Sequence, residues 1–81
     1  MSKKKVNVLF RPGDRIIAVS AIRDGSVNGL TGVVLSGPGH FKMYSIRFDI
    51  YSCHFHSCRG ECEQGHGWYL TADEMIKGDR V

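Results

Sequence analysis

The fold of this 81-residue chain is decided at residues 43–49, which read MYSIRFD. Tyr44, Ile46 and Phe48 alternate with the residues between them, and a period of two is typical of a strand that buries one face. The pattern therefore predicts a half-buried antiparallel strand whose three apolar side chains face the core.

Shorter segments on both sides of this strand also predict strands. They are residues 6–10, 15–22, 30–36, 68–70 and 76–77. Ten glycines against two prolines favour tight turns between short strands. We expect an all-β fold in which four to six short antiparallel strands close into a small, bent barrel and hide their edges.

Two local signals refine this expectation. Thr71 and Glu74 have the spacing of a capping box, which predicts one short 3-10 or helical turn through Met75. Gly32 interrupts its strand, and a lone strand glycine often marks a close approach of two backbones.

Length and charge limit the organisation to one domain. We expect residues 1–5 to form a flexible basic N-terminus, with Lys3, Lys4 and Lys5, and residues 6–81 to form the barrel. The formal net charge of +3 is modest. No secretory or membrane-spanning segment is visible, so we expect a cytoplasmic, monomeric protein.

A dense group of metal-ligand residues follows the 43–49 strand. All three cysteines and three of the four histidines lie between residues 53 and 66. Thiolates and imidazoles are the ligands that Zn²⁺ prefers, and a long irregular loop needs something to fix it. We expect structural zinc (Zn2+) in the loop of residues 50–67. The predicted ligands are His56, Cys58, Cys62 and His66, with Cys53 or His54 as alternates.

Two interpretations of the cluster without zinc stay open, a Cys58–Cys62 disulfide and free thiols beside surface histidines. A reducing compartment and an odd number of cysteines favour zinc over the disulfide. A catalytic zinc needs an open coordination position, and four soft ligands within eleven residues favour a closed shell. We therefore expect no catalytic residues.

Residues 12–19 (PGDRIIAV) and 28–34 (NGLTGVV) resemble the KOW-type and related SH3-like barrels. Residues 44–49 look like the third strand of such a barrel, and residues 68–75 look like its closing strand and 3-10 turn. The string HSCRGECEQGHGW at residues 56–68 is similar to one in small uncharacterised bacteriophage and bacterial proteins with SH3-like barrels. The resemblance implies an SH3-like barrel and fits a phage accessory protein.

Our first functional hypothesis is a non-enzymatic, zinc-stabilised binding module that engages a host protein in the host cytoplasm. The alternative is a KOW-like nucleic-acid-binding protein acting in transcription or translation, and a zinc-dependent enzyme comes last. Loop aromatics Phe41, Tyr51 and Phe55 are candidates for exposed contacts. The residues expected to contact nucleic acid or a partner are Lys3, Lys4, Lys5, Arg11, Arg15, Phe41, Tyr44 and Arg47.

Overall fold

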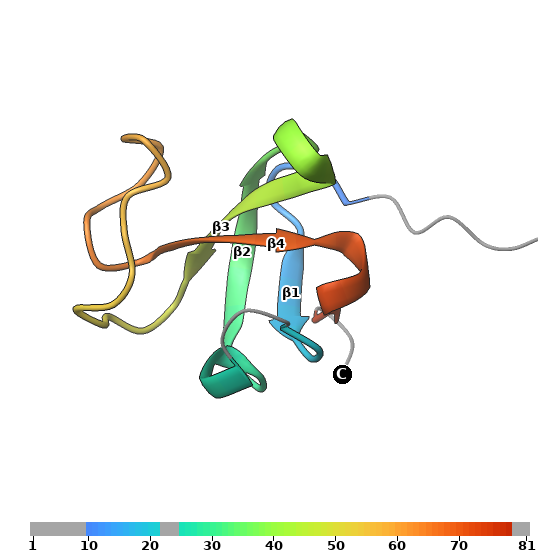
Figure 1. Cartoon of the computed structure of the whole chain (residues 1–81), viewed down its shortest axis with the longest axis horizontal. Coiled ribbons are helices and arrows are strands. Elements are labelled where there is room, and N and C mark those ends of the chain that lie inside the picture. Colours follow the sequence, from blue (N-terminus) through green and yellow to red (C-terminus); the bar gives the residue numbers. More distant parts are fainter. Residues whose placement is uncertain (1–9, 22–24, 79–81) are drawn as a thin grey trace, which may run out of the picture.

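The structure is a computed structural model that describes residues 10–21 and 25–78. Five antiparallel strands form one sheet in the order β4-β3-β2-β1-β5 (Figure 1). The strands are β1 (Arg15–Ala18), β2 (Thr31–Ser36), β3 (Met43–Phe48), β4 (Gly67–Thr71) and β5 (Met75–Lys77). Three 3-10 turns accompany them, η1 (Gly25–Val27), η2 (His40–Lys42) and η3 (Ala72–Glu74). The predicted all-β class is confirmed.

The sheet is strongly bent, because its two outer strands are consecutive in the sequence. In a flat sheet of five strands the outer strands would lie roughly 19 Å apart. The three residues of η3, at about 2 Å each, span much less than that. The end of β4 and the start of β5 therefore lie close together, and β5 pairs with β1.

The strand at residues 43–48 has the predicted orientation. Tyr44, Ile46 and Phe48 are all buried, and Tyr44 meets Phe10 edge to face. Their neighbours in the core come from every strand and from the connecting loops. Those neighbours include Ile16, Ala18, Val27, Val34, Phe55, Leu70 and Met75.

Gly32 lies where the sequence predicts a close backbone approach. It is paired with Phe48 in the β2–β3 ladder. A Cβ atom at this position would lie 2.5 Å from the carbonyl oxygen of Arg47. The site therefore has no room for a side chain.

The turn after β4 is the predicted capping box. The backbone N–H of Thr71 donates to Oε1 of Glu74 at 2.8 Å, and η3 follows. The strand predicted at 15–22 ends earlier, at Ala18, because the next two backbone N–H groups, those of Val19 and Ser20, donate to the carbonyl of Glu74. Of the strand predicted at 6–10, residues 6–9 lie outside the described residues, and Phe10 is buried.

Candidate binding pocket

The loop between β3 and β4, residues 49–66, projects from one side of the sheet (Figure 1). Phe55 anchors it. The Phe55 ring is 5% exposed and packs against Phe48 and Trp68, with ring centroids 5.1 and 5.5 Å apart. The prediction that Phe55 is an exposed contact group is therefore wrong. Tyr51, in contrast, is exposed as predicted.

Cys58 is a second anchor of the loop. Its side chain is fully buried, and its sulfur lies 3.6 Å from the carbonyl oxygen of Ile46 and 3.5 Å from that of Trp68. Burial disfavours the thiolate and raises the pKa of Cys58 to about 11. Burial also raises the pKa of Cys62. Cys58 is thus a protonated core thiol that donates to backbone carbonyls.

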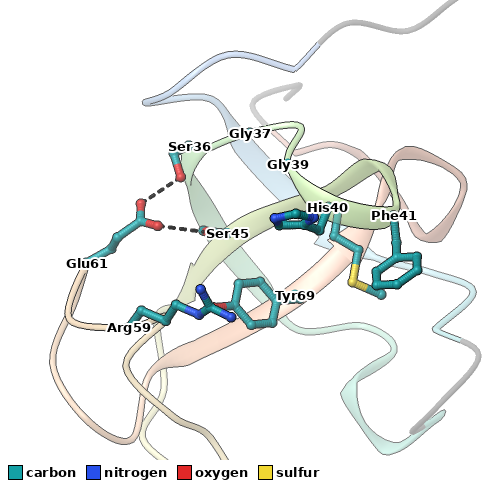
Figure 2. Close-up of a pocket in the computed structure, with 10 residues that line it drawn as sticks. Ser36, Gly37, Gly39, His40, Phe41, Ser45, Arg59, Glu61 and Tyr69 are labelled. Carbon is teal, nitrogen blue, oxygen red and sulfur yellow. Dashed lines mark hydrogen bonds between the residues drawn. The ribbon is translucent and has the colours of Figure 1, made fainter.

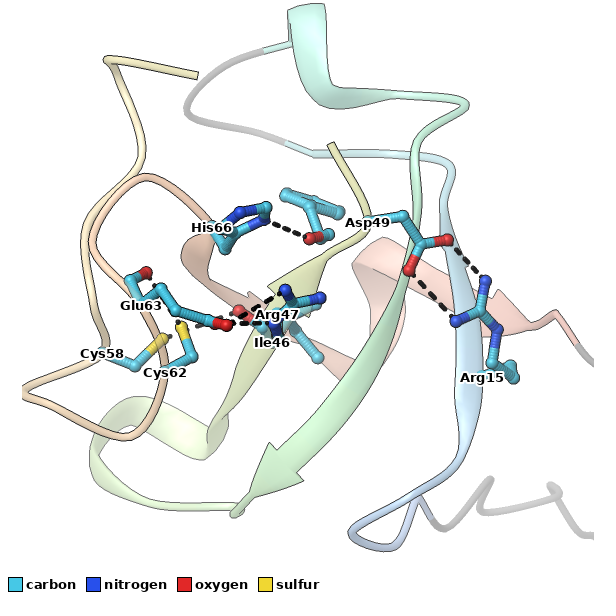
Figure 3. Close-up of polar contacts among 9 residues, drawn as sticks. Arg15, Ile46, Arg47, Asp49, Cys58, Cys62, Glu63 and His66 are labelled. Carbon is cyan, nitrogen blue, oxygen red and sulfur yellow. Dashed lines mark hydrogen bonds and ion pairs between the residues drawn. The ribbon is translucent and has the colours of Figure 1, made fainter. Parts of the chain in front are cut away.

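The four predicted zinc ligands do not converge on one point. Nδ1 of His56 accepts the backbone N–H of Cys58 at 2.9 Å, and the His56 ring stacks on Trp68. Nδ1 of His66 lies 2.9 Å from the carbonyl oxygen of Phe48 and, because that oxygen only accepts, carries the proton. Figure 3 shows His66 apart from the two cysteine sulfurs, which lie side by side.

Within residues 10–21 and 25–78, no group of three or more His, Cys, Asp or Glu side chains is arranged to hold a metal ion. The alternates Cys53 and His54 are exposed in the same loop. The donor set therefore does not fit zinc in this conformation. The loop has other anchors, Phe55 and Cys58, and the zinc site stays a prediction from the sequence.

Two short segments carry unusual backbone conformations. Among the described residues, positive φ angles occur outside glycine at Phe41 (58°), Lys42 (60°), Cys58 (51°) and Arg59 (59°). Left-handed conformations cost non-glycine residues roughly 1–2 kcal/mol each. At residues 57–62 they form a tight left-handed turn, in which the N–H of Cys62 donates to the carbonyl of Ser57 at 3.1 Å. Within the part of the chain that the structure describes, these strained residues lie in η2 and in this turn.

The two strained segments border one pocket of about 550 Å³ (Figure 2). Phe41 lines it and is 87% exposed. The carboxylate of Glu61 accepts hydrogen bonds from Oγ of Ser36 at 2.7 Å and from Oγ of Ser45 at 3.1 Å. The other lining residues are Gly37, Gly39, His40, Met43, Arg59 and Tyr69.

Two of the three predicted arginine contacts, Arg15 and Arg47, form ion pairs with carboxylates. Arg15 forms a two-point ion pair with Asp49, and its hydrogen bonds lower the pKa of that carboxyl. Arg47 pairs with Glu63 at 2.8 Å and lowers the pKa of Glu63 to about 2. Both guanidinium groups already have an anionic partner.

The remaining predicted contact residues differ in their exposure to solvent. Tyr44 is 4% exposed, so its ring cannot stack on a base and the structure removes it from the contact set. Arg11 and Phe41 are exposed. Lys3, Lys4 and Lys5 lie outside the described residues.

Glu61, the carboxylate in the pocket lining, was missed by sequence reasoning. Ser36 and Ser45 lie 25 and 16 positions from Glu61, and only the folded sheet and loop bring the three together. No local motif marks them.

No helix in the described part of the chain has the length and apolar character to cross a membrane. Comparisons with protein families, curated proteins and solved structures gave no match for this chain.

Proposed function

We propose that this protein is a non-enzymatic binding module whose pocket between η2 and residues 57–62 takes a segment of another protein. The observation that supports it is the placement of backbone strain. The two segments that carry positive φ outside glycine in residues 10–21 and 25–78 border the same pocket, and residues in strained conformations cluster at ligand clamps.

The lining residues indicate the chemistry of the occupant. Phe41, Met43 and Tyr69 supply apolar and aromatic surface. Glu61 supplies a carboxylate whose direction is set by two hydroxyl donors. A carboxylate accepts about four hydrogen bonds, so two acceptor positions remain for a cation. The best occupant is a peptide segment with an apolar side chain next to a lysine or arginine.

Charge favours a protein partner over nucleic acid. The formal net charge of the full chain is only +3, and Arg15 and Arg47 are each already paired with a carboxylate. Nucleic-acid binding draws on clustered unpaired cations. From the resemblance noted in the sequence of residues 56–68 alone, we further propose that the segment belongs to a host protein.

The test uses blocked tetrapeptides as probes. Acetyl-Gly-Leu-Arg-Gly-amide is titrated into ¹⁵N-labelled protein, alongside matched peptides with Glu in place of Arg or Ser in place of Leu. We expect saturable shifts of the amides of Ser45, Glu61 and Tyr69 with the first peptide, and weaker binding of the other two. Equal responses to all three peptides, or none at these amides, would overturn the proposal.

Two variants sharpen this test. Glu61→Gln removes the charge and keeps the side-chain shape, so binding of the Leu-Arg peptide should weaken about fivefold, the value of an exposed ion pair. Asp73→Asn is the matched control, because Asp73 is also exposed but lies outside the pocket lining. It should leave the affinity unchanged.

A further inference from the structure

We propose that Cys58 and Cys62 are a thiol pair that closes to a disulfide and thereby weakens the pocket. This regulation rests on the proposed function, because the pocket is the site that it controls. The residues enclosed by the disulfide would include Arg59 and Glu61, which both line the pocket.

The local backbone brings the thiols of Cys58 and Cys62 together. The left-handed turn at residues 58–60 reverses the chain, and the N–H of Cys62 returns to the carbonyl of Ser57. The two sulfurs consequently lie side by side (Figure 3). Cys53, the remaining cysteine, is exposed elsewhere in the loop.

The reaction needs a disulfide as oxidant, and a low-molecular-weight disulfide such as oxidised glutathione supplies it. Cys62 is the less buried of the pair, so it attacks first as the thiolate. A mixed disulfide forms, and one glutathione leaves as a thiol. Cys58 then gives up its proton to hydroxide and attacks the sulfur of Cys62 as the thiolate, and the second glutathione leaves as a thiolate that takes a proton from water. Two cysteine thiols are oxidised to one disulfide, and one glutathione disulfide is reduced to two thiols.

Closing the bond moves the pocket wall. A disulfide holds its sulfurs at about 2.05 Å, which is well inside any non-bonded contact. Cys58 is fixed by complete burial against β3 and β4, so Cys62 must do most of the moving. Its neighbour Glu61 is held by hydrogen bonds of 2.7 and 3.1 Å, which a shift of roughly 1 Å breaks. The oxidised pocket therefore loses its directed carboxylate.

The experiment uses the Cys53→Ser variant of the full chain, so that only the proposed pair carries thiols. The protein is equilibrated at mildly alkaline pH in glutathione buffers of graded redox potential. Peptide mapping by mass spectrometry should find an intramolecular Cys58–Cys62 disulfide. Binding of acetyl-Gly-Leu-Arg-Gly-amide should weaken about fivefold on oxidation, to the level of the reduced Glu61→Gln variant.

Two further variants make the result specific. When Glu61→Gln is added, oxidation should cause no further loss of affinity for the peptide, because the side chain that oxidation displaces is already neutral. With Cys62→Ser added, glutathione disulfide should change nothing, and this variant spares the buried thiol. Failure of the intramolecular disulfide to form, or its formation with unchanged affinity, would overturn the proposal.

Failure of the two proposals is distinguishable. If the reduced protein does not bind the peptide, the proposed function fails. The disulfide can still be detected without any peptide, by mass spectrometry. The release of Glu61 can be detected from the amide shifts of Ser36 and Ser45. Oxidation that leaves those shifts unchanged would overturn the displacement of Glu61 independently.

Discussion

Replacing Gly32 with alanine should lower the free energy of unfolding by roughly 2 kcal/mol. The new Cβ would lie 2.5 Å from the carbonyl oxygen of Arg47 and 3.0 Å from Cα of Phe48. Both atoms belong to the backbone of β3, so no side chain can turn away and the two strands must separate. Overpacking of this kind costs about 3 kcal/mol at the upper end of its usual range. The alanine recovers about 0.7 kcal/mol by restricting the unfolded chain.

The assay is urea unfolding followed by the fluorescence of Trp68, with thermal unfolding alongside. For a domain of this size, roughly 2 kcal/mol corresponds to a Tm lower by about 8–16 °C. Gly25→Ala is the matched control, because among the described residues its Cβ would meet just Nδ2 of Asn28, at 3.8 Å. The control should change stability by less than about 0.5 kcal/mol. If the two variants unfold at the same urea concentration, the close approach of β2 and β3 is wrong.

Three further predictions concern the loop and its ion pair. Arg47→Met should raise the pKa of Glu63 from about 2 toward its ordinary value of 4.5, measured by NMR titration of the carboxyl carbon. Because folding lowers the pKa of Glu63, the Arg47–Glu63 pair stabilises the fold at pH values above the ordinary pKa of Glu63. This stabilisation disappears as the pH falls toward 2. An unchanged pKa of Glu63 in the variant would refute the pairing. Maleimide should label Cys53 first, Cys62 later and Cys58 only on unfolding, and early labelling of Cys58 would contradict its burial. The zinc prediction expects one equivalent of Co²⁺ to give thiolate-to-metal absorption in reduced protein, and a featureless spectrum would contradict it.

The sequence predicts the sheet well, because each of its signals is local. The alternation at 43–49, the lone Gly32 and the spacing of Thr71 and Glu74 each act through neighbouring residues or one adjacent strand. The structure confirms all three. Two expectations differ among the described residues. The strand at β1 ends early, since the N–H groups of Val19 and Ser20 donate to Glu74, more than fifty residues away. The sheet also stays open where a closed barrel was expected, with β4 and β5 as its outer strands.

The loop and the pocket were harder to predict, because both depend on distant contacts. Phe55 carries no pattern that separates an anchor from an exposed aromatic, and its burial comes from Phe48 and Trp68. The spacing of the cysteines and histidines suggests converging ligands, but it does not contain the left-handed turn that directs Cys58 into the core. Glu61 becomes part of a site only through serines of two strands.

The pairing of β1 with β5 has a consequence for how the protein is made. Ile17 pairs with Ile76, so the first strand stays unmatched on one edge until almost sixty further residues have been synthesised. Contacts of such sequence separation slow folding, and an open strand edge attracts other chains. During translation β1 therefore cannot complete its pairing until β5 has emerged from the ribosome.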